Sequence, residues 1–234
     1  MKPTRDDIKL LPYRGELTAE MAARGIAAAK RNAERLLKDA NHLFEAGSYA
    51  TACSLAILSI EESGKVSILR EIFAAPTDQA RKDAWRRYRD HKSKNAQWIL
   101  MDLFRKGARK LAELKSIFDP KSAHPLLMDQ IKQLGIYTDC FSSRSWSEPE
   151  KVIDENITGE TLLVAAVLLP KDEVTTRELE LWKAHVGPVW GTPAMFDASL
   201  EFHRALIAEG LSEKRIEDYE RFFGINPTSA DNMH

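Results

Sequence analysis

The sequence predicts an all-α protein, and three features of its 234 residues indicate this. Apolar residues recur at steps of three and four, Gly and Pro separate the periodic segments, and no stretch alternates as a half-buried strand does. Hydrophobic residues make up 44% of the chain, enough for a buried core at this length. We therefore expect a helical bundle with a four-helix core and additional C-terminal helices.

The first two predicted helices form the centre of this bundle. Residues 18–46 repeat apolar positions at helical spacing, and Gly47 follows as a stop signal. Residues 49–73 are apolar on almost every side as far as Glu61, before Pro76 ends the helical pattern. We expect this second helix to be the most buried.

A third helical segment begins at Thr77 or Asp78 and runs through a basic stretch, AWRRYRDHKSKN, into residues 96–118, and the sequence leaves open whether the helix breaks near His91 to Lys94. An irregular loop is expected over residues 136–152. Further helices are expected at 126–135, 158–169, 175–186, 193–210 and 212–224. We divide the chain into an N-terminal arm (1–17), a helical domain (18–190) and a C-terminal helical extension packed on the domain (191–234).

Composition excludes several classes of protein. The formal net charge of −1 predicts no general attraction to nucleic acid or to anionic membranes, so any phosphate binding must come from a local basic cluster. The charged N-terminus does not resemble a signal peptide, and the apolar runs are too short to span a bilayer, which favours a cytoplasmic protein without a membrane partner. Cys53 and Cys140 have no metal or disulfide spacing. We expect two ordinary buried thiols, no metal and no cofactor.

Two carboxylates lie near the centre of the second helix. Glu61 and Lys65 are four residues apart with the acid first, the favourable order for a helical ion pair. Glu62 interrupts an otherwise apolar row, and a buried carboxylate needs a cation or donor beside it. Glu62 either belongs to a structural network closed by an arginine of the third helix, or orients an Arg or His at an active site.

The basic stretch places Arg86, Arg87, Arg89, Lys92 and Lys94 around His91. Alternating charges of this kind usually coat a solvated helix face. In a continuous helix Arg87 and His91 share a face, whereas Arg86 and His91 diverge by about 140°. Arg86 would then reach the imidazole only through its long side chain, a helix break or a dimer partner.

A resemblance to a known family gives this stretch a second interpretation. The segment NAERLLKDANHLFEAGSYATACSLAILSIEESGKVSILR followed by WRRYRDHKSKN, and LGIYTDCFSSRSWSEP further on, resembles the AbiV-type branch of the HEPN superfamily. The similarity covers about residues 18–186. HEPN nucleases carry an Arg, then four to six residues, then a His, and the resemblance places this motif at Arg86 and His91.

The Arg-to-His spacing alone is uninformative, because Arg35 and His42 match it as well. Position after the Glu-Glu-Ser-Gly-Lys segment selects Arg86 and His91, and we interpret Arg35 and His42 as structural residues on the core-facing side of the first helix. The family often has Asn, Asp or His after the motif Arg. Arg87 stands there in this chain, which leaves open whether Arg86 or Arg87 contacts the phosphate.

The resemblance implies a HEPN-like bundle acting as a homodimeric, metal-independent endoribonuclease in abortive infection, a growth-arresting toxin that a phage-derived protein could activate. RNA supplies its own 2′-OH nucleophile, so His91 would move the proton and Arg86 would stabilise the phosphorane, leaving a 2′,3′-cyclic phosphate. Glu61, Glu62, Lys65 and Arg87 would support this site, and Arg89, Lys92 and Lys94 would bind the RNA backbone.

Two alternatives remain beside the nuclease. A non-catalytic HEPN-like protein could bind a phage or host protein through the loop that carries Tyr137 and Trp146, blocking growth or translation, and a plain structural bundle would have no site at all. Trp182 and Trp190 are interpreted as packing residues rather than as a platform for bases.

Overall fold

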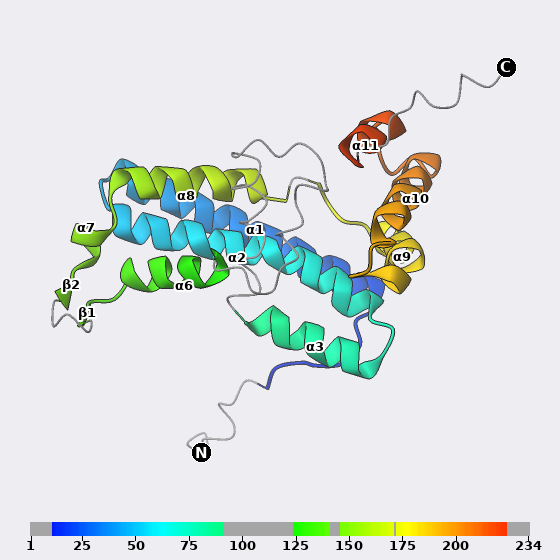
Figure 1. The fold of residues 1–234 in the computed structure, drawn as a ribbon, viewed down its shortest axis with the longest axis horizontal. Coiled ribbons are helices and arrows are strands. Elements are labelled where there is room, and N and C mark those ends of the chain that lie inside the picture. Colours follow the sequence, from blue (N-terminus) through cyan, green and yellow to red (C-terminus); the bar gives the residue numbers. More distant parts are fainter. Residues whose placement is uncertain (1–10, 91–123, 141–145, 171, 224–234) are drawn as a thin grey trace, which may run out of the picture.

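The all-α prediction is confirmed by a computed structural model, which describes residues 11–90, 124–140, 146–170 and 172–223 (Figure 1). Apart from one small β-hairpin, the described elements are helices. They are α1 (Ala19–Glu45), α2 (Tyr49–Ala74), α3 (Asp78–Arg89), α6 (His124–Leu134), α7 (Pro149–Val152), α8 (Glu155–Leu168), α9 (Thr176–His185), a 3₁₀ turn (Gly187–Val189), α10 (Met195–Ala208) and α11 (Ile216–Phe223). No helix among these is long and apolar enough to cross a membrane.

The long helices α1 and α2 run side by side through the molecule, and α6 and α8 pack along the same half of α2 (Figure 1). These four helices form the predicted core. Helix α1 buries a single stripe, which includes Ala22, Ile26 and Ala33, whereas α2 buries residues on most of its circumference. The most buried helix is therefore α2, as its uniformly apolar sequence predicts.

Two glycines allow the close turns and contacts of this core. Gly47 has a φ of +76°, a left-handed conformation that lets the chain reverse between α1 and α2. A Cβ on Gly135 would lie 2.3 Å from Ser54 Oγ and 2.7 Å from the carbonyl oxygen of Ala50. Gly135 thus lets the end of α6 approach the backbone of α2 closely.

The C-terminal helices attach through α9, which packs against α1 and α2 and carries α10 on its other side. Glu178 of α9 pairs with Arg70 of α2. The Trp182 ring lies 5.5 Å from Trp190 and 5.4 Å from Phe202 between ring centroids, so both tryptophans pack as predicted.

Three sequence predictions require correction. The expected irregular loop contains an antiparallel hairpin, in which β1 (Asp139–Cys140) pairs with β2 (Trp146–Ser147). Cys53 is buried, but Cys140 is exposed, because it lies on this short hairpin outside the bundle. The third helix ends at Arg89, since Asp90 adopts an extended conformation and caps it.

Candidate functional site

Helix α3 carries the basic segment, and its ends are fixed by local capping. The Thr77 side chain accepts a hydrogen bond of 3.1 Å from the backbone N–H of Ala80, which starts the helix. Three arginines in the last turn suit the negative end of the helix dipole. At the C-terminus, the N–H of Asp90 donates to the carbonyls of Arg86 and Arg87.

Trp85 anchors α3 to the bundle. Its side chain is buried in a cluster with residues of α1, α2 and α9, including Ile26, Ile72 and Leu179. The Tyr88 ring packs edge-on against Trp85, and Lys65 Nζ of α2 lies 5.3 Å from the Tyr88 ring centroid. Lys65 of α2 is thus in contact with α3.

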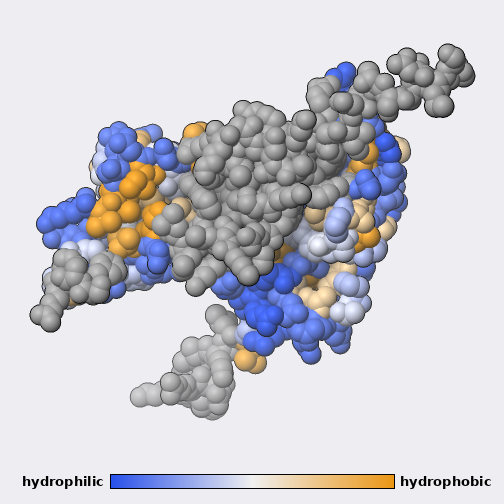
Figure 2. Space-filling model, viewed as in Figure 1, coloured by the Kyte–Doolittle hydropathy of each residue, from blue (hydrophilic) through white to orange (hydrophobic). Residues whose placement is uncertain are grey.

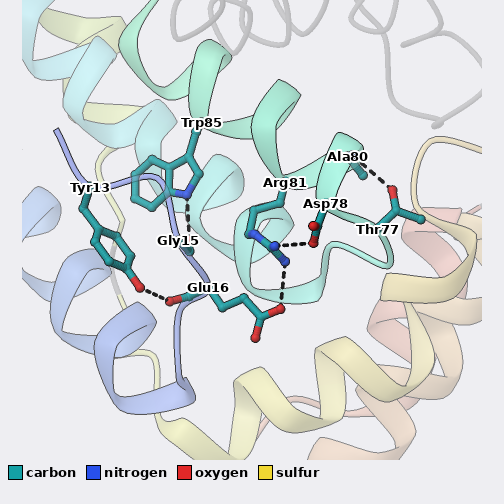
Figure 3. A network of polar contacts seen from close by, with 8 residues as sticks. All are labelled: Tyr13, Gly15, Glu16, Thr77, Asp78, Ala80, Arg81 and Trp85. Atoms are coloured by element: carbon teal, nitrogen blue, oxygen red, sulfur yellow. Dashed lines mark hydrogen bonds and ion pairs between the residues drawn. The ribbon is translucent and has the colours of Figure 1, made fainter.

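The described part of the N-terminal arm, residues 11–17, runs beside α3 (Figures 1 and 3). Trp85 Nε1 donates 3.0 Å to the carbonyl of Gly15, and the Tyr13 ring meets the Trp85 ring edge-on. Arg81 forms ion pairs with Glu16, at 2.9 Å, and with Asp78. Sequence reasoning did not predict this docking, because the arm has no periodic pattern.

The three predicted arginines of α3 have different surroundings. The Arg86 side chain is 76% exposed and contacts Asp83 at 2.5 Å. The Arg87 side chain is 40% exposed and pairs with Glu71 of α2. Arg89 donates 2.9 Å to the carbonyl of Trp85 and 2.5 Å to that of Tyr13, with its guanidinium 5.0 Å from the Trp85 ring centroid.

A basic pocket of about 420 Å³ lies on the outer side of α3. Four cations and one carboxylate line it among the described residues, so its local charge is positive. Figure 2 shows the hydrophilic surface that covers this helix. The lining residues are Arg14, Gln79, Lys82, Asp83, Trp85, Arg86 and Arg89. Arg14 and Lys82 were not among the predicted site residues, and the one available signal for Lys82 was its spacing of four from Arg86.

His91, Lys92 and Lys94 lie outside the described residues. The angles between these side chains were derived for a helix that continues through residue 91, whereas α3 ends at Arg89 and the ψ of Asp90 is 121°. The angular divergence derived for a continuous helix therefore does not apply to Arg86 and His91, whose cooperation stays a prediction.

The two carboxylates of α2 differ from the prediction in their burial and in their partners. Glu61, not Glu62, is the buried one, with a relative exposure of 2%. Its Oε1 lies 2.6 Å from Lys132 Nζ of α6, while Glu62 pairs with Lys65 at 2.5 Å. An arginine of the third helix was expected to close the Glu62 network, but Lys65 is the cation found there, and Arg87 of α3 pairs with Glu71.

Lys132 is charged in this setting. Burial by itself lowers its pKa, but the hydrogen bonds that Lys132 donates to the Glu61 and Asp129 carboxylates, together with their negative charges, outweigh burial, so the pKa of Lys132 is raised. Since α6 and α2 supply opposite charges to one buried contact, the pair of Glu61 and Lys132 joins α2 to α6.

Arg35 and His42, the second pair with the Arg-to-His spacing, face solvent and not the core-facing side of α1 that was predicted. Arg35 and His42 are both exposed, because the buried stripe of α1 passes through Ala33, Leu36 and Ala40 instead. Arg35 pairs with Asp39 at 2.9 Å on the surface.

Two exposed aromatic side chains lie at the hairpin, Trp146 in β2 and Tyr137 two residues before β1. Tyr137 is 62% exposed and Trp146 is 70% exposed, and Tyr137 borders a cavity of about 530 Å³ with Asp129, Gln133 and Asp139. Within the described ranges, no group of three or more His, Cys, Asp or Glu residues has the arrangement of a metal site.

Comparison with known families assigns the larger part of the chain to one family. A family model described as AbiV, HEPN_AbiV, matches residues 21–170. No curated protein and no solved structure matches the chain at a significant level. The match includes α1, α2, α3, α6 and α8, and it leaves the arm and the helices from α9 onward outside.

Proposed function

Because the chain belongs to the AbiV family of HEPN proteins, we propose that it acts in abortive infection as a metal-independent endoribonuclease. The observation that supports this activity best is the setting of Arg86. Its guanidinium is exposed at the end of α3, at the mouth of a positively charged pocket and five residues before His91. The Arg86 guanidinium pairs with Asp83 of its own helix but stays 76% exposed, so part of it remains accessible to a phosphate. Arg87 is less exposed and joins α3 to Glu71 of α2, as a structural arginine does.

The chemistry uses groups that the chain supplies. Arg86 holds the scissile phosphate with its planar fork and neutralises the charge that develops on the phosphorane. His91 exchanges the proton of the 2′-OH or of the leaving 5′ oxygen. The products are a 2′,3′-cyclic phosphate and a 5′-hydroxyl. Arg89, Lys92 and Lys94 add attraction for the backbone.

Two copies of the chain would place two such motifs at one cleft. One His91 then acts as the base and the other as the acid, which a single imidazole does less readily within one turnover. The homodimer and a phage-derived activating protein are both part of this proposal.

Variants of the arginines separate catalysis from structure. We expect Arg86→Gln to lower kcat at least about 100-fold, the usual effect of removing one group that stabilises the developing charge, with little change in unfolding temperature. His91→Ala abolishes cleavage. Arg87→Gln loses the ion pair with Glu71, so it lowers stability more than it lowers kcat. An Arg86→Gln protein as active as the wild type would refute this role.

A non-catalytic function remains the second candidate, because the exposed aromatics Tyr137 and Trp146 offer a protein-binding surface. If the chain halts growth by binding alone, Tyr137→Ser with Trp146→Ser abolishes toxicity in cells while Arg86→Gln and His91→Ala leave it intact. The nuclease proposal predicts the opposite pattern.

A further inference from the structure

We propose that the basic pocket on α3 is a phosphate subsite for the RNA strand next to the cleaved bond, and that Arg14 of the arm and Lys82 complete it. This inference rests on the proposed function, since it assumes that the strand cut at the motif continues along α3. It assigns a binding role to the arm, which the family match does not include.

The cations form a row that leads to the motif. Lys82, Arg86 and Arg89 are spaced by four and three residues, so they share one face of α3 over about 10 Å. This face ends at the last turn of the helix, directly before His91 in the chain. A strand bound at Arg86 therefore meets further positive charge when it follows the helix toward Lys82.

Among the residues that the structure describes, much of this charge has no carboxylate partner. In the part of the chain that the structure describes, Arg14 and Lys82 form no ion pair, and Arg89 donates to neutral carbonyl oxygens. Asp83 contacts Arg86, and it also accepts from Gln79. The pocket thus holds four cations against one carboxylate, which favours an anionic ligand with several charges, such as a phosphodiester backbone.

The arm is seated in a way that positions Arg14. The carbonyl of Tyr13, on one side of it, accepts from Arg89, and the carbonyl of Gly15, on the other side, accepts from Trp85. Figure 3 shows how Tyr13, Gly15 and Glu16 lie along α3. Because the backbone on both sides of Arg14 is held, less ordering is needed when its side chain binds a phosphate.

Binding is measured with full-length His91→Ala protein, so that cleavage does not interfere, and a fluorescent single-stranded RNA titrated at several salt concentrations. We expect Arg14→Gln and Lys82→Gln each to weaken binding roughly fivefold or more, as the loss of one charge-assisted phosphate contact does. The slope of log K against log salt should fall by about 0.7 for each variant.

The matched control is Lys151→Gln, which removes the same charge from an exposed lysine of α7 at the far end of the molecule (Figure 1). This variant should bind like the parent, and Arg14→Lys should recover part of the affinity. With His91 restored, Arg14→Gln should raise KM while kcat at saturating RNA stays unchanged.

Parental affinity and salt slope in both Arg14→Gln and Lys82→Gln would overturn the subsite. Failure of the proposed function has a different signature, because wild-type protein would then leave RNA intact whatever the binding titrations show.

Discussion

The buried contact between Glu61 and Lys132 makes a sharp prediction at the scale of single residues. Lys132→Met removes the cation that lies 2.6 Å from a carboxylate inside the bundle, so we expect a loss of about 3 kcal/mol in the free energy of unfolding. The double variant Glu61→Gln, Lys132→Met should recover much of that loss, because the buried carboxylate at position 61 is then gone and only the partly exposed Asp129 has lost its cation. Urea denaturation measures both, and a loss under about 1 kcal/mol in the single variant would contradict the assignment.

His203 should make stability depend on pH. Burial lowers its pKa, Lys214 and Arg70 lower it further, and the Ser199 carbonyl, 2.6 Å from Nδ1, raises it in part. The unfolded chain then binds a proton at His203 more readily than the folded protein does. The stability that neutral His203 contributes is therefore complete above pH 6.5, the ordinary histidine pKa, and is lost as the pH falls below that value.

Wild-type protein should therefore lose more stability between about pH 7.5 and pH 5 than His203→Gln does. The unfolding temperatures of both proteins are measured at each pH. Subtracting one profile from the other removes the effect of the titrating groups that the two proteins share. Parallel pH profiles for the two proteins would show that His203 contributes nothing.

At the scale of elements, α3 depends on the Thr77 cap. Thr77→Ala should cost about 1 kcal/mol, because the N–H of Ala80 loses its acceptor. Thr51→Ala is the matched control, since Thr51 is exposed near the start of α2 without a capping role, and alanine suits a helix better. Equal unfolding temperatures for Thr77→Ala and wild type would contradict the role of this cap.

The elements themselves differ in how far the sequence predicts them. Helix α1 follows from its apolar periodicity and α2 from its uniformly apolar run between Gly47 and Pro76, because both signals lie within one segment of the chain. The β-hairpin could not be predicted in this way, since each strand has only two residues and shows no alternation. Ser147 Oγ accepts a hydrogen bond from the backbone N–H of Asp139, a side-chain contact that leaves no pattern in the sequence. The end of α3 was equally unreadable, because charged residues continue through it without a Gly or Pro.

At the scale of the whole molecule, the candidate site was only partly predictable. Arg86 follows from the resemblance and its place in the chain, but the choice between Glu61 and Glu62 as the buried acid depends on Lys132, which is 71 residues away. The docking of the arm depends on contacts such as that between Trp85 and Gly15, 70 residues apart. Such contacts between distant segments leave no periodic signal in one sequence.

Metal-independent cleavage, with the 2′-OH of the RNA as the nucleophile, is recognised by what the reaction requires and by the ends that it leaves. Purified protein is incubated in EDTA with an RNA and with its 2′-deoxy counterpart, with and without extract of phage-infected cells, and the products are identified by mass spectrometry. We predict 2′,3′-cyclic phosphate and 5′-hydroxyl ends from the RNA and an intact deoxy strand. Cleavage of the deoxy strand, a requirement for divalent metal, or intact RNA under every condition would contradict the account.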